Sequence, residues 1–370
     1  MDYDVITNDL LAFITADAPH DEAFNQMALQ LFAYQFTHNQ AFAKFARSRG
    51  KTPRTVTSWT DIPAVPINAF KALDMSCCKP GDAAAVFLTS GTTQSGLRGK
   101  SYHQTLGVYD ASMRHNFSKR FMGGADRIRM GILFPGKAMM PNSSLAHYMN
   151  LAKVHFGLPE SETLIDDSGI DFDRLIAGLR NAEVTDQPYA LLGASFSLVH
   201  ALDGLATRGH SFCLPAGSRI LDTGGFKGQS RELTLDAFYD ALSDRFGVPR
   251  SQCFNMYGMT ELSTQFYDQG NAVCPSLKSG PHWIRSRVIN PLTNAAMPKG
   301  EVGVLEHTDL AHVTMVSTIL TEDTGIETDD GFLLLGRADG AEAKGCSMAV
   351  DAFLKATGVT GGISGGDGRT

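Results

Sequence analysis

From residue 83 onward, short apolar segments alternate with amphipathic segments, and this alternation constrains the fold more than any other feature. The apolar segments with the length and composition of strands are 85–89, 128–134, 189–194, 219–222, 253–256, 302–306 and 332–335. Between the earlier strands, apolar residues recur at helical spacing in 103–121, 143–156, 171–180, 196–207 and 233–246. Because strands that alternate with helices form largely parallel sheets, we predict an α/β fold.

The remaining segments differ from this core. Residues 1–80 have the spacing of helices, and strands with glycine-containing turns dominate after residue 283. We therefore predict four regions. They are a helical N-terminal region (1–80), an α/β core (81–282), a β-rich subregion (283–345) and a short C-terminal tail (346–370).

Composition argues against several classes of protein. The chain has 370 residues, of which 43% are hydrophobic and 19% charged, as is typical of a globular protein. Its formal net charge of -7 argues against a nucleic-acid partner. No apolar run has the length of a membrane span, and the acidic N-terminus lacks the basic residues of a secretory signal, so we expect a cytoplasmic protein. The cysteines lack the spacing of a zinc site or a disulfide framework.

A loop rich in glycine and hydroxyl side chains follows the first core strand and precedes a predicted helix. Its glycines free main-chain N–H groups to surround an anion, its hydroxyls donate further hydrogen bonds, and two cations offset phosphate charge. It is not a Walker A loop, because Gln94 stands where that pattern requires glycine. A surface loop without a ligand is the alternative. The residues concerned are Thr89, Ser90, Gly91, Thr92, Thr93, Arg98 and Lys100.

Taken in order with this loop, four later segments resemble motifs of the adenylate-forming superfamily, which activates carboxylates with ATP. Residues 222–226 read DTGGF, 255–261 read NMYGMTE, 320–325 read LTEDTG, and 336–337 read GR. The third departs from the usual Thr-Gly-Asp at Glu322. Within the superfamily the chain is most similar to the LuxE-type acyl-protein synthetases, on the evidence of Arg98 and Lys100 in the loop and of GRADGAEAKGCS at 336–347. The resemblance covers residues 60 to 350 and implies the large N-terminal domain of adenylate-forming enzymes.

The resemblance implies a role for each matched residue. Thr89, Ser90, Gly91, Thr92 and Thr93 would bind the phosphates of ATP, with Arg98 or Lys100 at the β- and γ-phosphates. Gly225, Tyr257, Gly258 and Thr260 would border the nucleotide, Glu261 would bind Mg²⁺, Asp323 the ribose, and Arg337 the ribose or a phosphate. From the residues alone, other interpretations stay open: Tyr257 as a packed aromatic ring, Glu261 as a helix cap, and Asp323 as a turn residue.

In the resembled family, a cysteine near the C-terminus accepts the acyl group, and Cys346 is the matching residue. We expect Cys346 to lie near a mobile tail and the neighbouring Lys344 to lower its pKa, which would favour the thiolate. An ordinary buried thiol is the alternative. Larger members of the superfamily use a lysine of a C-terminal domain for adenylation, and this lysine has no counterpart here, since Lys355 lacks the matching context.

These observations predict ATP-dependent activation of a carboxylic acid, with a fatty acid favoured by the resemblance. The acyl group would pass to Cys346 and then to a partner, either an acyl-CoA or fatty-acid reductase or an acyl carrier protein. Two alternatives remain. One is a ligase that transfers the acyl group to coenzyme A or a carrier protein, and the other is a catalytically silent nucleotide-binding subunit.

Overall fold

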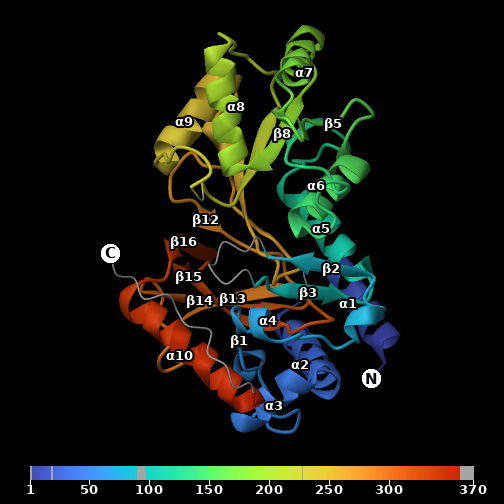
Figure 1. Ribbon diagram of the computed structural model, residues 1–370, viewed down its shortest axis with the longest axis vertical. Helices are drawn as coiled ribbons and strands as arrows, with labels where there is room; N and C mark the ends of the chain where they lie inside the picture. Colours follow the sequence, from blue (N-terminus) through green and yellow to red (C-terminus); the bar gives the residue numbers. More distant parts are fainter. Residues whose placement is uncertain (1, 18–19, 90–96, 227, 359–370) are drawn as a thin grey trace. The chain divides into compact units, whose positions relative to one another are not determined.

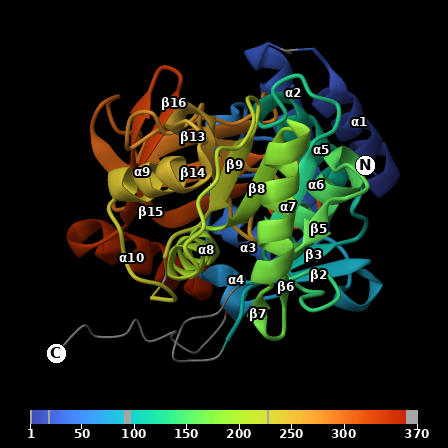
Figure 2. The same ribbon diagram turned by 90° about the horizontal axis from the view of Figure 1, so that it is seen from above.

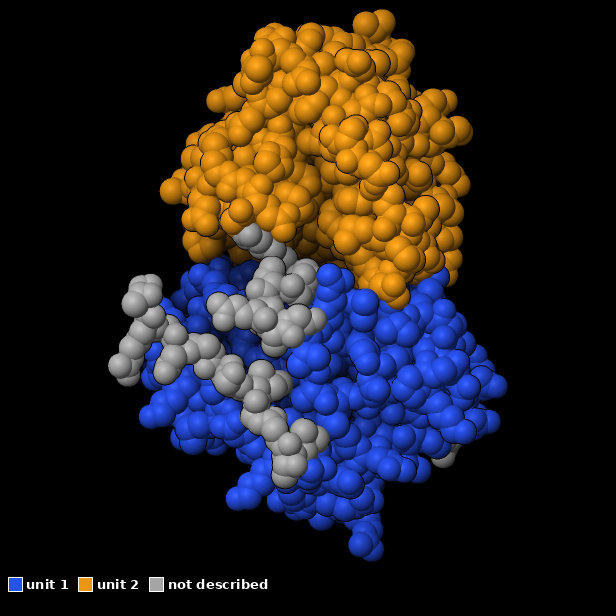
Figure 3. All heavy atoms as spheres, in the orientation of Figure 1, with its two compact units in different colours: residues 1–112, 259–264, 280–370 blue, residues 113–258, 265–279 orange. Residues whose placement is uncertain are grey.

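The structure is a computed structural model that describes residues 2–17, 20–89, 97–226 and 228–358 (Figure 1). Contacts divide the chain into two compact units, which Figure 3 colours separately. Unit 1 consists of residues 1–112, 259–264 and 280–370, and unit 2 of residues 113–258 and 265–279. Each unit therefore joins stretches that are distant in the sequence, whereas the sequence analysis divides the chain into consecutive regions at 80, 282 and 345.

Unit 2 is built on a largely parallel sheet with the strand order β11-β10-β9-β8-β4-β5. All neighbours in it are parallel except β11, which runs antiparallel to β10. The strands are β4 (Arg129–Leu133), β5 (Glu162–Thr163), β8 (Tyr189–Ala194), β9 (Arg219–Thr223), β10 (Cys253–Tyr257) and β11 (Phe266–Tyr267). The predicted α/β core is confirmed, with strand ends within one residue of the expected positions for β8, β9 and β10.

Helices cover the sheet of unit 2. α7 (Phe172–Thr185), α8 (Ser195–Thr207) and α9 (Leu235–Phe246) share one apolar core with Cys253 of β10. The next residue, Phe254, contacts the ring of Phe121 just after α5 (Gly107–Arg120), with 5.6 Å between centroids. Because successive strand residues point to opposite faces, α5 lies on the other face from α7, α8 and α9. Both ribbon views show α8 and α9 side by side (Figures 1 and 2).

Unit 1 contains an antiparallel sheet in which β16, β15, β14 and β13 are successive neighbours, with β1 paired in parallel to β15. The strands are β1 (Val65–Pro66), β13 (Ile284–Ile289), β14 (Val302–Asp309), β15 (Thr318–Thr328) and β16 (Gly331–Arg337). The predicted β-rich character after residue 283 is confirmed. Its helices are α1 (Tyr3–Thr15), α2 (Asp21–His38), α3 (Gln40–Ser48), α4 (Ala69–Ala72) and α10 (Gly340–Thr357).

The shorter elements complete the described chain. Besides α6 (Ser144–Phe156), they are η1 (Trp59–Asp61), η2 (Pro80–Asp82), η3 (Arg250–Gln252), β6 (Ile165–Asp166), β7 (Gly169–Ile170) and β12 (Leu277–Lys278). In the part of the chain that the structure describes, no helix combines the length and the apolarity needed to cross a bilayer.

The glycine- and hydroxyl-rich loop joins two strands, which corrects the expectation that a helix follows it directly. β2 (Ala85–Leu88) and β3 (Lys100–His103) form an antiparallel hairpin in which Leu88 pairs with Lys100. α5 begins only at Gly107, so the predicted helix 103–121 starts four residues too early. A helix N-terminus therefore does not follow the loop directly, so the predicted anion site cannot draw on one.

Helix α10 extends to Thr357 and so includes residues 346–357 of the expected tail, 346–370. It begins at Gly340, and its residue Phe353 contacts the ring of Phe45 in α3, with 4.8 Å between centroids. Gly345 packs so closely on Pro291 that a Cβ atom at Gly345 would lie 2.6 Å from the proline Cγ. Cys346 consequently lies in a packed helix and not in a tail, while residues 359–370 lie outside the described residues.

Candidate active site

In unit 2, the predicted nucleotide-binding residues follow two neighbouring parallel strands. Gly225 comes two residues after β9, while Tyr257 ends β10 and Gly258 follows it. Thr223 pairs with Met256, and the Thr223 hydroxyl donates a hydrogen bond to the Met256 carbonyl at 2.9 Å, so the two strand ends are held together. The carboxyl ends of parallel strands are the usual ligand-binding edge of an α/β sheet. A Cβ atom added at Gly225 would meet no atom within 4 Å, which leaves space at this edge.

Tyr257 is buried, with 9% of its surface exposed, and its ring contacts Phe266 at 5.9 Å between centroids. It is therefore a packed aromatic residue at the strand end, and this position is also compatible with the predicted role beside a nucleotide.

A buried carboxylate that sequence reasoning did not single out supports this edge. Asp222 accepts hydrogen bonds from Ser195 (2.8 Å), Tyr239 (2.9 Å) and Asn255 (2.8 Å). Burial raises the pKa of Asp222 to about 6, while the hydrogen bonds from Ser195 and Asn255 oppose that change. Asp222 thus ties β9 to α8, α9 and β10. The only sequence signal was its place at the start of the DTGGF segment.

In unit 1, Thr89 and Gly99 close the neck of the glycine- and hydroxyl-rich loop. The Thr89 N–H donates to the Gly99 carbonyl, and the Gly99 N–H donates to the Thr89 hydroxyl, both at 2.9 Å. A Cβ atom at Gly99 would lie 3.0 Å from Cγ2 of Thr89 and 3.5 Å from Oε1 of Glu261. The neck therefore lies against the predicted magnesium ligand. Ser90, Gly91, Thr92 and Thr93 lie outside the described residues.

The position of Glu261 is fixed by Ser263 and Thr264, which lie just after it in the chain and bind Asp309. The main-chain N–H groups of Ser263 and Thr264 both donate to Oδ2 of Asp309 at 2.8 Å. The Thr264 hydroxyl donates to Oδ1 of the same carboxylate at 2.7 Å, and the Ser263 hydroxyl lies 2.8 Å from Nδ1 of His312. Asp309 and His312 are completely buried or nearly so, and this fixed network sets the position of the 259–264 segment.

The Glu261 side chain is a buried acid, with 7% of its surface exposed. Burial raises its pKa to about 7, while the positive charges of Lys71 and Arg337 act in the opposite direction. Among the described residues, no cation lies within ion-pair distance of Glu261, and it is not part of a helix. Its interpretation as a helix cap is therefore wrong. Thr260, which precedes it, is half-buried.

Asp323 and Arg337 face each other across neighbouring strands. They are opposite residues of the antiparallel pair β15 and β16, and Nε of Arg337 lies 3.4 Å from Oδ1 of Asp323. Arg337 also lies 3.4 Å from Oε2 of Glu322, whose other oxygen accepts a hydrogen bond from the side chain of Asn68. Asp323 is a strand residue, so its interpretation as a turn residue is wrong.

The two candidate phosphate-binding cations have different surroundings. Lys100 lies 3.2 Å from Asp74, and the hydrogen bond to Asp74 raises the pKa of Lys100. Arg98 is exposed and has no ion pair among the described residues. Lys100 is thus already paired with Asp74, so Arg98 is the better candidate for binding a phosphate.

Cys346 is close to this group but buried, with 4% of its surface exposed. Its thiol donates to the Thr321 carbonyl at 3.7 Å, two residues before Asp323. Burial raises the pKa of Cys346 to about 11, and the negative charges of Glu322, Asp323 and Glu342 add to this effect. The expectation that Lys344 lowers the pKa of Cys346 is wrong, because Lys344 is exposed to solvent and the acidic residues prevail.

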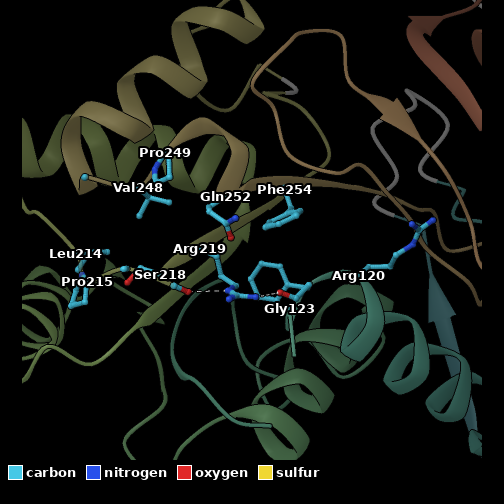
Figure 4. A pocket seen from close by; sticks show the side chains of 14 residues that line it. Arg120, Gly123, Leu214, Pro215, Ser218, Arg219, Val248, Pro249, Gln252 and Phe254 are labelled. Carbon is cyan, nitrogen blue, oxygen red and sulfur yellow. Dashed lines mark hydrogen bonds between the residues drawn. The ribbon is translucent and has the colours of Figure 1, made fainter. Parts of the chain in front are cut away.

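A cavity of about 490 Å³ lies in unit 2 but at the opposite edge of the sheet (Figure 4). Its lining includes Arg219 and Gln252, which stand at the amino-terminal ends of β9 and β10, and it includes no predicted site residue. Arg219 donates to the carbonyls of Gly217 and Phe121. These two carbonyls accept hydrogen bonds from the buried guanidinium, so Arg219 has a structural role at the end of α5.

Comparison with known proteins identifies the fold and the family. The fold is similar to that of a 2-hydroxyisobutyryl-CoA ligase solved in the postadenylation state in complex with R3-HIB-AMP. The TM-score is 0.64 at 15% sequence identity, over 86% of this chain and 68% of that one. The fold is therefore that of the adenylate-forming enzymes.

The matched family is described as acyl-protein synthetase, LuxE, and the match extends over residues 2–354. The chain belongs to this family, which confirms the resemblance. It is 23% identical to the long-chain-fatty-acid–luciferin-component ligase of Vibrio harveyi, over 81% of this chain and 78% of that protein. The protein of the same name from Aliivibrio fischeri is 21% identical over 82% of this chain and 79% of its own length.

Proposed function

We propose that the protein activates a long-chain fatty acid with ATP and then transfers the acyl group to its own Cys346. The observation that carries this proposal is the group of side chains in unit 1 around the neck of the loop. There Glu261 lies against Gly99, Asp323 faces Arg337, and Cys346 contacts the same strand two residues before Asp323. The fatty acid is proposed from the names of the two Vibrio and Aliivibrio relatives.

In the first step, a carboxylate oxygen of the acid attacks the α-phosphorus of ATP. A bond forms between that oxygen and phosphorus, the bond to the bridging oxygen breaks, and pyrophosphate leaves with the electron pair. Since acid and triphosphate are both anionic, positioning and charge neutralisation account for most of the catalysis. Asp323 accepts hydrogen bonds from the ribose hydroxyls, and Arg337 contacts the ribose or a phosphate.

The surroundings of Glu261 fit a magnesium ion bound together with the nucleotide. The described residues contain no group of three or more acidic, histidine or cysteine side chains that could hold a metal alone. Mg²⁺ usually binds through one or two carboxylates with phosphate oxygens and water as its other ligands. A buried carboxylate without a described ion pair at the neck of a phosphate-binding loop suits this arrangement. Bound there, Mg²⁺ would neutralise phosphate charge.

In the second step, the Cys346 sulfur attacks the acyl carbon of the adenylate. The carbon–sulfur bond forms, the bond from the acyl carbon to the phosphate oxygen breaks, AMP leaves, and the thiol proton is lost to solvent. Because Cys346 is buried against β15, the transfer requires α10 to shift. Gly336 and Gly340, with φ values of +131° and +51°, border the connection from β16 to α10 and can absorb such a shift.

The thioester would then deliver the acyl group to a partner reductase. A thioester is activated toward attack by a second thiol, so the partner needs a nucleophilic cysteine of its own.

The burial of Cys346 favours a second candidate function. A thiol with 4% exposure and a pKa raised to about 11 is a poor acceptor in its resting position. The adenylate would in that case be captured by an external thiol, either coenzyme A or the pantetheine of a carrier protein, and Cys346 would be dispensable.

Intact-protein mass spectrometry separates these candidates. Wild-type protein, Cys346→Ser and Cys213→Ser are incubated with Mg-ATP and a panel of carboxylic acids of increasing length. We expect an ATP-dependent acyl adduct that hydroxylamine releases, present in wild type and Cys213→Ser but missing in Cys346→Ser. Cys213 is an exposed thiol and controls for non-enzymatic acylation. An adduct that persists in Cys346→Ser would contradict the assignment of Cys346.

A further inference from the structure

Helix α4 contacts the neck of the loop beside Glu261, and it carries a lysine that belongs to none of the recognised motifs. Lys71 lies in this short helix, after Phe70. The Cβ atom of Phe70 lies 3.5 Å from the position of a Cβ at Gly99, as does Oε1 of Glu261. At its start, α4 is held by the hydrogen bond from Asn68 to Glu322, the neighbour of Asp323. The helix therefore contacts both the loop neck and the ribose side of the proposed site.

The charges around this site leave Lys71 available. Glu261, Glu322 and Asp323 are acidic, and Arg337 lies within 3.4 Å of two of them. Among the described residues, Lys71 is half-buried and makes no ion pair. Its positive charge nevertheless acts on Glu261 more strongly than that of Arg337 does. An unpaired, partly desolvated lysine beside acidic groups is available for an anionic ligand.

We propose that Lys71 is a catalytic residue of the adenylation step, with its ammonium group donating hydrogen bonds to phosphate oxygens of ATP next to Glu261. This proposal rests on the proposed function and adds a residue to it. As the carboxylate attacks, negative charge grows on the phosphoryl oxygens and on the departing pyrophosphate. A fixed cation there stabilises the transition state more than the ground state. No proton is transferred, since the ammonium acts only as a charged donor.

The test compares the variants Lys71→Met and Lys71→Arg. The matched control is Lys79→Met, which removes an exposed lysine between α4 and η2. Each variant is assayed for carboxylate-dependent exchange of pyrophosphate into ATP and for the shift in melting temperature caused by Mg-ATP. A third assay supplies synthetic acyl adenylate and measures acyl transfer without adenylation.

We expect Lys71→Met to lose about a hundredfold or more in exchange rate and to show a smaller Mg-ATP shift. It should retain transfer from synthetic adenylate within a few-fold, Lys71→Arg should recover part of the exchange, and Lys79→Met should behave as wild type. Unchanged exchange in Lys71→Met, or an equal loss of exchange and transfer, would overturn the role of Lys71. If wild type itself shows no carboxylate-dependent exchange, the proposed function fails, which is a distinct result.

Discussion

At the residue scale, Glu261 combines a buried position with an acid group that has no described ion pair. Its pKa is raised by burial from 4.5 to about 7, so the folded protein holds a proton at pH values where the unfolded chain has lost it. The contribution of Glu261 to the free energy of unfolding is therefore fully present below pH 4.5. It is lost as the pH rises through 7, because the buried carboxyl must then ionise.

This property predicts how Glu261→Gln changes stability. Without nucleotide, the variant should be more stable than wild type at pH 8, by up to about 3 kcal/mol in the free energy of unfolding. The difference should shrink as the pH falls toward 4.5. Urea unfolding between pH 4.5 and 8 measures it, with the exposed Glu301→Gln as control. Parallel pH profiles for wild type and Glu261→Gln would contradict the burial argument.

The motifs alone were enough to single out some of the candidate residues, whose roles stay predictions. They led to Asp323 and Arg337, which the structure places opposite each other, and to Glu261, which lies against Gly99. They did not lead to Asp222 or Asp309, because the hydrogen-bond partners of these residues are distant in the sequence. Asp309, for example, binds Ser263 and Thr264.

At the scale of elements, the sheet of unit 2 followed the apolar pattern because its central strands are buried and continuous. β15 was missed, since its TEDTG segment is polar and its strand conformation depends on pairing with both β14 and β16. β3 was missed, since its residues were taken for the end of the loop and its last residue, His103, for the start of the helix 103–121. α10 was taken for a tail because its contacts, such as Phe353 with Phe45, are long-range.

The packing of α10 gives self-acylation a distinctive pH dependence. With the pKa of Cys346 raised to about 11, the thiolate fraction grows about tenfold per pH unit between 7 and 9. Acyl transfer from synthetic adenylate should follow this slope if the thiol loses its proton before α10 shifts and exposes the sulfur. Transfer rates measured by mass spectrometry at several pH values test this, with pyrophosphate exchange as a reference that does not need the thiolate. A rate independent of pH would show that the thiol reacts from another environment.

At the scale of the whole molecule, a few motifs were enough to predict a LuxE-type acyl-protein synthetase, and the family match confirms that family. The division into units could not be predicted in the same way. Residues 259–264 belong to unit 1 although both flanking stretches belong to unit 2. Hydrogen bonds from Ser263 and Thr264 to Asp309 fix this assignment, and no local pattern in the sequence reports them.

The account as a whole depends on adenylation, and carboxylate-dependent exchange of labelled pyrophosphate into ATP measures that step without requiring Cys346 or a partner. We predict exchange that needs both Mg²⁺ and a long-chain fatty acid, and that continues in Cys346→Ser. Absence of exchange with every acid of the panel, in protein shown to be folded, would contradict the central claim and leave a nucleotide-binding subunit without turnover.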